Sequence, residues 1–201
     1  MNWLEIAQTN KDAFLALAAI GAFLMTGITA LLSFIGLIKS KRIDMQIKEQ
    51  ETVRKFLEDG MIGLGEKMHE VLATATILVT KFENPPLQHH PEYVTSIQKH
   101  KSRIDSDKKH LIKAKAVYRY KLYGMEEGIS IIARVGDWVK GLNNNIPLAR
   151  KLLKEADEVR KSIDRELLKC YRKGTYPSWW SKRRVNRRVK KIRLLWDRRN
   201  I

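Results

Sequence analysis

Cysteine is almost absent from this sequence of 201 residues, because Cys170 is the only one. No intramolecular disulfide can form, which agrees with a reducing compartment. Catalytic patterns are missing as well: we find no Ser/His/Asp arrangement, no glycine-rich phosphate loop and no paired-carboxylate pocket. His89 and His90 are adjacent in a proline-rich segment, but no cysteine or HExxH motif completes a zinc site there. We expect no enzyme, no metal site and no cofactor.

Proline is also scarce, and none of the five prolines precedes Pro85. No segment alternates between polar and apolar residues as a half-buried strand does, and the sequence contains neither an internal repeat nor a low-complexity tract. We therefore predict an all-α fold. Its expected helices are a long one from residue 13 to about Phe82, then 92–105, 108–123, 125–140, 147–173 and a last one starting near Ser178. Asp105, Ser106 and Asp107 are expected to cap the break between the second and third.

Charged residues are missing from Ala13 to Ile38, a run of 26 residues. As a helix this run is about 39 Å long, enough to cross a hydrocarbon core of about 30 Å. A cleaved signal peptide is the alternative, but its apolar part is typically about 7–15 residues long and follows a basic segment. We predict a retained single-pass transmembrane helix.

The residues that flank this span predict its orientation. Lys39, Lys41 and Arg42 follow it directly, whereas Glu5, Lys11 and Asp12 precede it. The positive-inside rule then places residues 1–12 outside and the C-terminal domain in the cytoplasm. Trp3 would lie in the outer interface.

Small residues form one stripe along the span, at alternating steps of three and four: Ala19, Ala22, Thr26, Thr29, Ser33, Gly36 and Ser40. The same spacing continues through Ile43, Ile47, Gln50 and Arg54 into an apolar seam, Leu57, Met61, Leu64, Met68, Val71, Ala75, Leu78 and Phe82. A heptad seam of this kind predicts a coiled-coil-like stalk. Two interpretations stay open for its cytoplasmic part: parallel copies of the chain in a cyclic homo-oligomer, or the chain's own later helices.

These patterns divide the chain into five parts: a short extracytoplasmic N-terminus (1–12), the transmembrane helix (13–38), the stalk (39–82), a cytoplasmic helical bundle (83–174) and a basic amphipathic C-terminal helix (175–201). Pro85 and Pro86 end the long helix. Pro147 and Gly174 are expected at the first turn and just after the end of the helix over 147–173.

The formal net charge of +17 is concentrated at the C-terminus, where residues 174–201 contain ten basic residues and one acid, Asp197. Val185, Val189, Ile192 and Trp196 form an apolar face there. The other face carries the candidate phosphate-binding residues Lys182, Arg183, Arg184, Arg187, Arg188, Lys190 and Lys191. Binding of nucleotide or nucleic acid, binding of the anionic inner leaflet, and simple packing with solvated charge all fit this pattern.

Aromatic residues are interspersed among these cations. Trp179 and Trp180 precede the basic run, and Tyr118, Tyr120 and Tyr123 alternate with cations in an earlier helix. Bases stack on such rings, so Trp179 and Trp180 join the candidate nucleotide site. The alternative is that Trp179, Trp180 and Trp196 anchor the core or an interface.

Two functions follow from this organisation. In the first, copies form a ring in which Thr26, Thr29 and Ser33 face a conducting axis, Ile43 and Ile47 make a constriction, and an anionic signal on the basic domain shifts the assembly between closed and open states. In the second, the helix is a non-conducting tether for a scaffold that binds nucleic acid or anionic lipid, and the small residues serve only close helix packing.

The organisation of the chain resembles that of bacterial antiviral membrane effectors controlled by nucleotide or oligonucleotide signals, of the Hailong type or of the single-span type that accompanies type III CRISPR systems. The resemblance rests on the span Ala13–Ile38, its in-register continuation to Phe82, and Arg183, Arg184, Arg187 and Arg188. It implies a tetramer-like assembly, a partner nucleotidyltransferase that makes the signal, and loss of membrane potential on activation. It is a likeness of architecture and includes no signature motif.

Overall fold

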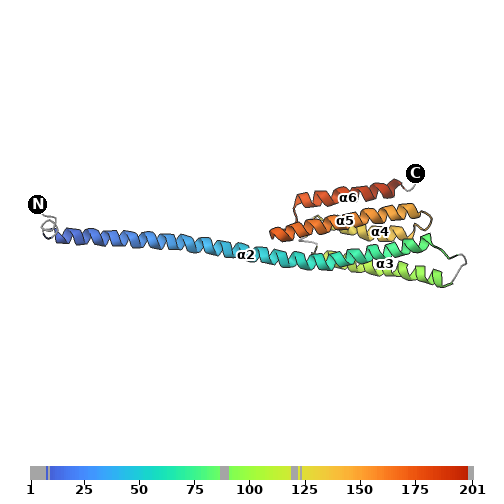
Figure 1. Ribbon diagram of the computed structural model, residues 1–201, viewed down its shortest axis with the longest axis horizontal. Coiled ribbons are helices and arrows are strands. Elements are labelled where there is room, and N and C mark those ends of the chain that lie inside the picture. The colour runs from blue at the N-terminus through green and yellow to red at the C-terminus, as the bar shows by residue number, and fades with distance from the viewer. Residues whose placement is uncertain (1–7, 9, 87–90, 119–121, 123, 199–201) are drawn as a thin grey trace. The chain divides into compact units, whose positions relative to one another are not determined.

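The computed structural model describes residues 8, 10–86, 91–118, 122 and 124–198, and these residues form five helices and no strand. The helices are α2 (Lys11–Glu83), α3 (Pro91–Tyr118), α4 (Glu126–Lys140), α5 (Ile146–Lys173) and α6 (Trp179–Asp197) (Figure 1). The predicted all-α fold is confirmed. The chain forms two compact units, Met1–Glu49 and Gln50–Ile201, called unit 1 and unit 2 below. The predictions for Trp3, His89, His90, Tyr120 and Tyr123 lie outside the described residues.

Helix α2 is long because nothing in its sequence stops it before Pro85. Asp12 lies in its first turn and Lys81 in its last, which suits the helix dipole. The helix ends at Glu83, because the residue before a proline is driven out of the helical conformation and Pro85 and Pro86 donate no backbone hydrogen bond.

The described part of unit 1 belongs to α2 apart from two residues, and every side chain in it is exposed. Its most apolar 18-residue stretch has a mean hydropathy of 2.2. Phe23 is 79% exposed and Leu17 66%. The chain thus has one N-terminal helix that is long and apolar enough to span a membrane, and an apolar solvent removes the cost of exposing these side chains to water.

The seam of α2 is buried from Leu57 onward by later helices of the same chain. Leu57, Leu64, Met68, Val71 and Leu78 are fully buried within unit 2. Polar contacts hold the neighbouring helices against α2: the Thr74 hydroxyl donates to Asp107 at 2.8 Å, and the Tyr118 hydroxyl to the Asp59 carbonyl at 3.2 Å. Of the two interpretations of the cytoplasmic seam, packing on the chain's own helices therefore describes residues 57–82. These residues are not available to a second copy in this conformation.

Helix α3 corrects the prediction of two helices separated by Asp105, Ser106 and Asp107. It runs unbroken from Pro91 to Tyr118, because no glycine or proline interrupts it. Instead of capping a helix, the two aspartates accept hydrogen bonds from side chains of neighbouring helices: Asp105 accepts from Lys140, and Asp107 accepts from Thr74. Along α3, Val94 is 59% exposed, whereas Ile104 is fully buried.

Helix α5 ends at Lys173 as predicted and begins at Ile146, one residue before the predicted start, while α6 begins at Trp179, next to the predicted Ser178. Asn145 caps α5 by accepting from the Leu148 amide at 3.2 Å, and Gly174 ends the helix in the left-handed conformation with φ 62°. The apolar face of α6, Val185, Val189 and Ile192, is buried. Trp196 stacks on Trp138 of α4 with ring centroids 4.2 Å apart. The C-terminal helix thus packs on unit 2 through its apolar face and leaves its cations outward.

Two helical glycines give opposite expectations for the same substitution. A Cβ at Gly65 meets only Asp164 Oδ1, at 4.0 Å, so Gly65→Ala should stabilise unit 2 by up to about 1 kcal/mol through helix propensity. A Cβ at Gly128 would lie 2.7 Å from Val185 Cγ1 and 3.0 Å from Ile163 Cδ1. Val185 cannot easily move away because valine is stiff at χ1. Overpacking of this kind costs about 1–3 kcal/mol, so Gly128→Ala should destabilise unit 2. Urea unfolding of the full chain in detergent, followed by circular dichroism, measures both, and equal shifts of the two midpoints would contradict this packing.

Candidate functional site: an exposed stripe and a basic cleft

The small-residue stripe is exposed along its whole length in unit 1. Two of its hydroxyls bond to their own helix: Thr26 Oγ1 donates to the Ala22 carbonyl, and Thr29 Oγ1 to the Met25 carbonyl, both at 2.8 Å. The hydroxyl hydrogens are thereby used, while the oxygen lone pairs remain able to accept a hydrogen bond or to contact a cation. The stripe therefore presents acceptors on an otherwise apolar helix.

The predicted constriction residues follow the stripe within unit 1. Ile43 is 47% exposed and Ile47 48%. Both come after the cationic residues Lys39, Lys41 and Arg42 at the end of the uncharged span. Their exposure leaves them free to contact a second copy.

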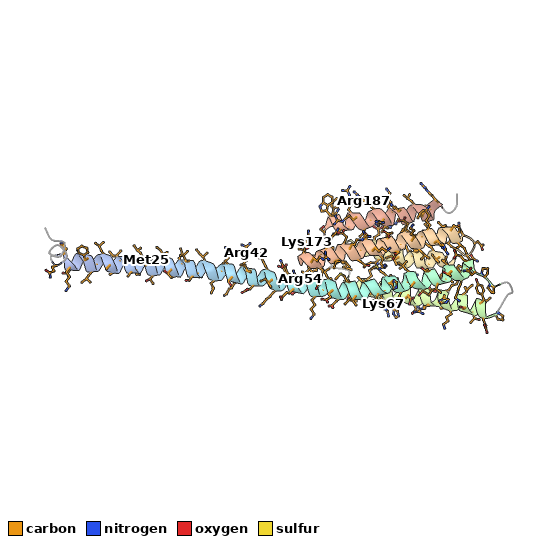
Figure 2. The ribbon with its side chains drawn as sticks, viewed as in Figure 1. Met25, Arg42, Arg54, Lys67, Lys173 and Arg187 are labelled. Carbon is orange, nitrogen blue, oxygen red and sulfur yellow. The ribbon has the colours of Figure 1, made fainter. Side chains whose placement is uncertain are left out.

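A basic cleft lies between α5 and α6 in unit 2, with a volume of about 410 Å³. Its lining combines six cationic side chains with one acid and one hydroxyl: Ser162, Arg165, Glu166, Lys169, Arg184, Arg187, Arg188 and Lys191. Four of the predicted phosphate-binding residues of α6 therefore line one cleft. Figure 2 shows the side chain of Arg187 projecting from α6. Such a concentration of positive charge attracts anions.

Glu166 is the acid at the base of this cleft, and its carboxylate is almost fully buried. It accepts hydrogen bonds from Ser181 Oγ at 2.9 Å, from Arg184 at 2.5 Å and from Lys169 at 3.3 Å. Burial alone would raise the pKa of Glu166, but the bonds from Arg184, Ser181 and Lys169 more than offset it, so its pKa lies below the usual value. Glu166 thus holds α6 on α5 as a buried anion.

The cations of the cleft fall into two groups. Arg184 and Lys169 are paired with Glu166, and Arg188 is paired with Glu158 at 3.3 Å; the pairs of Arg184 and Arg188 serve the packing of α6 on α5. Arg165, Arg187 and Lys191 form no ion pair with an acid in the described part of the chain. The guanidinium groups match two oxygens of a phosphate, and the ammonium supplies a third donor. These three side chains are the ones that a bound anion would engage.

The other predicted residues of α6 lie elsewhere. The Lys182 side chain lies against Gly124, and Lys190 lines a different hollow with Glu127 and Arg193. Arg183 lies over the rings of Trp179 and Trp180. Helix α6 therefore does not present its cations as one site.

Sequence reasoning missed Arg165 and Lys169 of α5, which complete the cleft. Their spacing of four residues on the polar face of α5 was visible, but their distance along the chain from Arg187 concealed the shared site. Cys170 is buried beside them. Burial, followed by the charge of Glu166, raises the pKa of the Cys170 thiol, so the thiol stays protonated at neutral pH.

Glu166 makes the stability of unit 2 depend on pH. A carboxyl whose folded-state pKa is depressed contributes stability above its unfolded pKa of about 4.3 and loses it as pH falls through the folded value. Glu166→Gln should therefore destabilise unit 2 at pH 7 by about 1–2 kcal/mol. The loss stays in this modest range because Arg184 is half exposed and solvent screens its charge. The difference in stability from wild type should vanish at strongly acidic pH. Urea midpoints across pH measure this effect, with exposed Glu58→Gln as the control. A pH-independent loss would mean that Glu166 acts through its shape and not through its charge.

No group of three His, Cys, Asp or Glu residues suited to a metal ion occurs in the range that the structure describes. Comparison of the chain with protein-family models, with curated proteins and with solved structures finds no match.

Proposed function

We propose that the chain is an oligomeric membrane effector: a gated ion channel that depolarises the bacterial inner membrane in antiviral defence. A phosphate-bearing nucleotide or oligonucleotide on the basic cleft would control it. The observation that carries the proposal is the fully exposed apolar helix of unit 1, whose hydroxyl-bearing residues lie along one side only, within a stripe of small residues. The proposed orientation, with the N-terminus outside and unit 2 in the cytoplasm, follows from Lys39, Lys41 and Arg42 after the span.

Association of parallel copies would use the stripe. Small residues let helix backbones approach closely in a bilayer, where the hydrophobic effect between helices is lost. In a ring, for which we favour a tetramer, Thr26, Thr29 and Ser33 would line the axis. The hydroxyl oxygens of Thr26 and Thr29, whose hydrogens already bond to the backbone, can replace part of the hydration of a passing cation. Ile43 and Ile47 would form an apolar constriction beyond the charged residues.

Control would come from the basic cleft. Arg165, Arg187 and Lys191 supply donors suited to phosphate oxygens. A bound signal shifts the equilibrium between a closed and an open state only if it binds the two states with different affinities. The proposed source of the signal is a separate nucleotidyltransferase, as the resemblance to the antiviral effectors implies.

A second candidate function is a non-conducting membrane tether or scaffold that binds nucleic acid or anionic lipid. The bonds of Thr26 and Thr29 to their own backbone favour it, because hydroxyls satisfied in this way also pack inside a closed, dry helix assembly. Ala19, Ala22 and Gly36 would then bring the helices together without leaving a pore.

The test is to reconstitute the full chain in liposomes that hold a potassium diffusion potential, and to follow a voltage-sensitive dye with and without ATP or a short oligoadenylate. Chemical cross-linking in the same liposomes reports the oligomer. Dissipation of the potential that depends on one of these anions supports the channel. Cross-linked oligomers that retain the potential under every condition would reject the channel in favour of the tether.

A further inference from the structure

Trp179 and Trp180 open helix α6 as an exposed aromatic pair. Their side chains are 50% and 61% exposed, and their rings meet edge to face with centroids 4.8 Å apart. Neither ring is part of the core, so of the alternative that they anchor the core or an interface only the interface remains, whereas Trp196 does pack, stacked on Trp138. Two adjacent tryptophans left in water are costly unless they serve contact with a partner.

Arg183 completes this surface. Its guanidinium carbon lies 5.3 Å from the centroid of the Trp179 ring and 6.0 Å from that of Trp180. A cation over aromatic faces is a favourable pairing. The guanidinium also lies over one face of each ring, where a nucleic-acid base would otherwise stack. The pair is therefore better suited to insertion among headgroups than to base stacking.

The tryptophan pair lies at the same end of unit 2 as Gln50, the first residue of that unit. The α5–α6 turn packs there against α2: a Cβ at Gly174 would lie 2.9 Å from Gln50 Cβ, and Tyr176 meets Phe56 with ring centroids 6.1 Å apart. Figure 2 shows Lys173 and Arg54 at this same end. Gln50 follows Ile38, the last residue of the uncharged run, by only twelve positions in the chain.

The chemistry around the pair selects an anionic membrane surface. Tryptophan is enriched where hydrocarbon meets water, because its ring is amphipathic. Lys173, Lys182 and Arg183 flank the rings, and no acid occurs between residues 174 and 196. Cationic residues close to a leaflet are attracted to its anionic lipids.

We propose that Trp179, Trp180 and Arg183 form a docking surface for the anionic headgroup region of the leaflet from which the span continues into unit 2. The rings insert at the headgroup level, and Arg183 contacts lipid phosphate. This inference rests on insertion of the helix of unit 1 into the membrane but not on ion conduction, so it stands or falls separately from the channel.

The test uses quenching of tryptophan emission by lipids that are brominated near the headgroup end of the acyl chain. The full chain is reconstituted as the Trp3→Phe variant, so that the remaining tryptophans all belong to unit 2. We expect quenching in vesicles with about one third phosphatidylglycerol, and loss of that quenching when Trp179→Phe and Trp180→Phe are added. The Trp138→Phe/Trp196→Phe variant, in the same background, should keep it.

Charge reversal separates headgroup attraction from simple burial of the rings. Arg183→Glu should weaken quenching in the anionic vesicles more than in zwitterionic ones, whereas Lys190→Glu, two turns further along α6, should not. Resistance to alkaline extraction shows in each sample that the span is inserted. Equal quenching with and without Trp179 and Trp180 in inserted protein would overturn the proposal. So would quenching by a single-stranded oligonucleotide in place of the brominated lipid, which would assign the pair to base stacking.

Discussion

Replacing Thr29 and Ser33 by leucine should abolish the ion current that we propose for the reconstituted chain. Each change fills the stripe with an apolar side chain and removes an oxygen, so the proposed axis loses both its width and its acceptors. We expect the rate of potential loss to fall by about tenfold or more, because a desolvated ion has no ligand to replace its water. Dye-reported potentials in the liposomes described above measure the rate.

Two matched variants separate pore chemistry from helix packing. Gly27→Leu makes a change at least as large on the opposite side of the helix, where a Cβ meets nothing within 4 Å, and should leave the current intact. Thr29→Ser keeps the hydroxyl and should also conduct. An unchanged current in the Thr29→Leu/Ser33→Leu protein, with its cross-linking pattern preserved, would show that the stripe does not line a conduction path.

Reversing the charges of Arg187 and Lys191 should remove anion binding from unit 2. Both side chains line the basic cleft, and neither forms an ion pair with a described acid, so their replacement by glutamate disturbs no known packing contact. Reversing two charges next to a bound polyanion should lower the affinity of the protein for that polyanion by at least about a hundredfold. The dependence of this affinity on salt concentration should also become less steep. Fluorescence anisotropy with a labelled oligoadenylate over a range of salt concentrations measures both effects on the full chain in detergent.

Lys182→Glu/Lys190→Glu is the matched control, since it changes the net charge equally on the same helix but outside the cleft. We expect it to weaken binding only slightly, through the general field of the protein. If both double variants lost affinity equally, the cleft would not be a site and the attraction would belong to the whole basic surface.

The long helix and the amphipathic helices were predictable because their signals are local. Ala13–Ile38 lacks charge, Pro85 stops α2, and Pro147 and Gly174 mark the two ends of α5. The break expected at Asp105–Asp107 was wrong because capping residues are also tolerated inside a helix when other helices offer partners. Here Thr74 and Lys140 offer them.

The identity of packing partners was the part that the sequence left open. A heptad seam specifies an apolar stripe but not what covers it, so Leu57 to Phe82 fitted both a second copy and the chain's own helices. The cleft was hidden for a similar reason. Arg187 and Arg165 line the same cleft because α6 docks on α5 in the register that the bonds of Glu166 to Arg184 and Ser181 help to fix.

The burial of the α2 seam by α3 to α6 has a consequence for the order of events during synthesis. The ribosome makes the span and the whole seam first, and Trp196, which packs on the same core, comes 114 residues after Phe82. At about 5–20 residues per second, the apolar seam of a nascent chain stays uncovered for roughly 6–23 seconds. During that interval it can pair with the seam of a neighbouring nascent chain on the same messenger. Slow translation of residues 83–196 would lengthen this window, so the yield of correctly folded protein depends on how quickly the last helix follows the first.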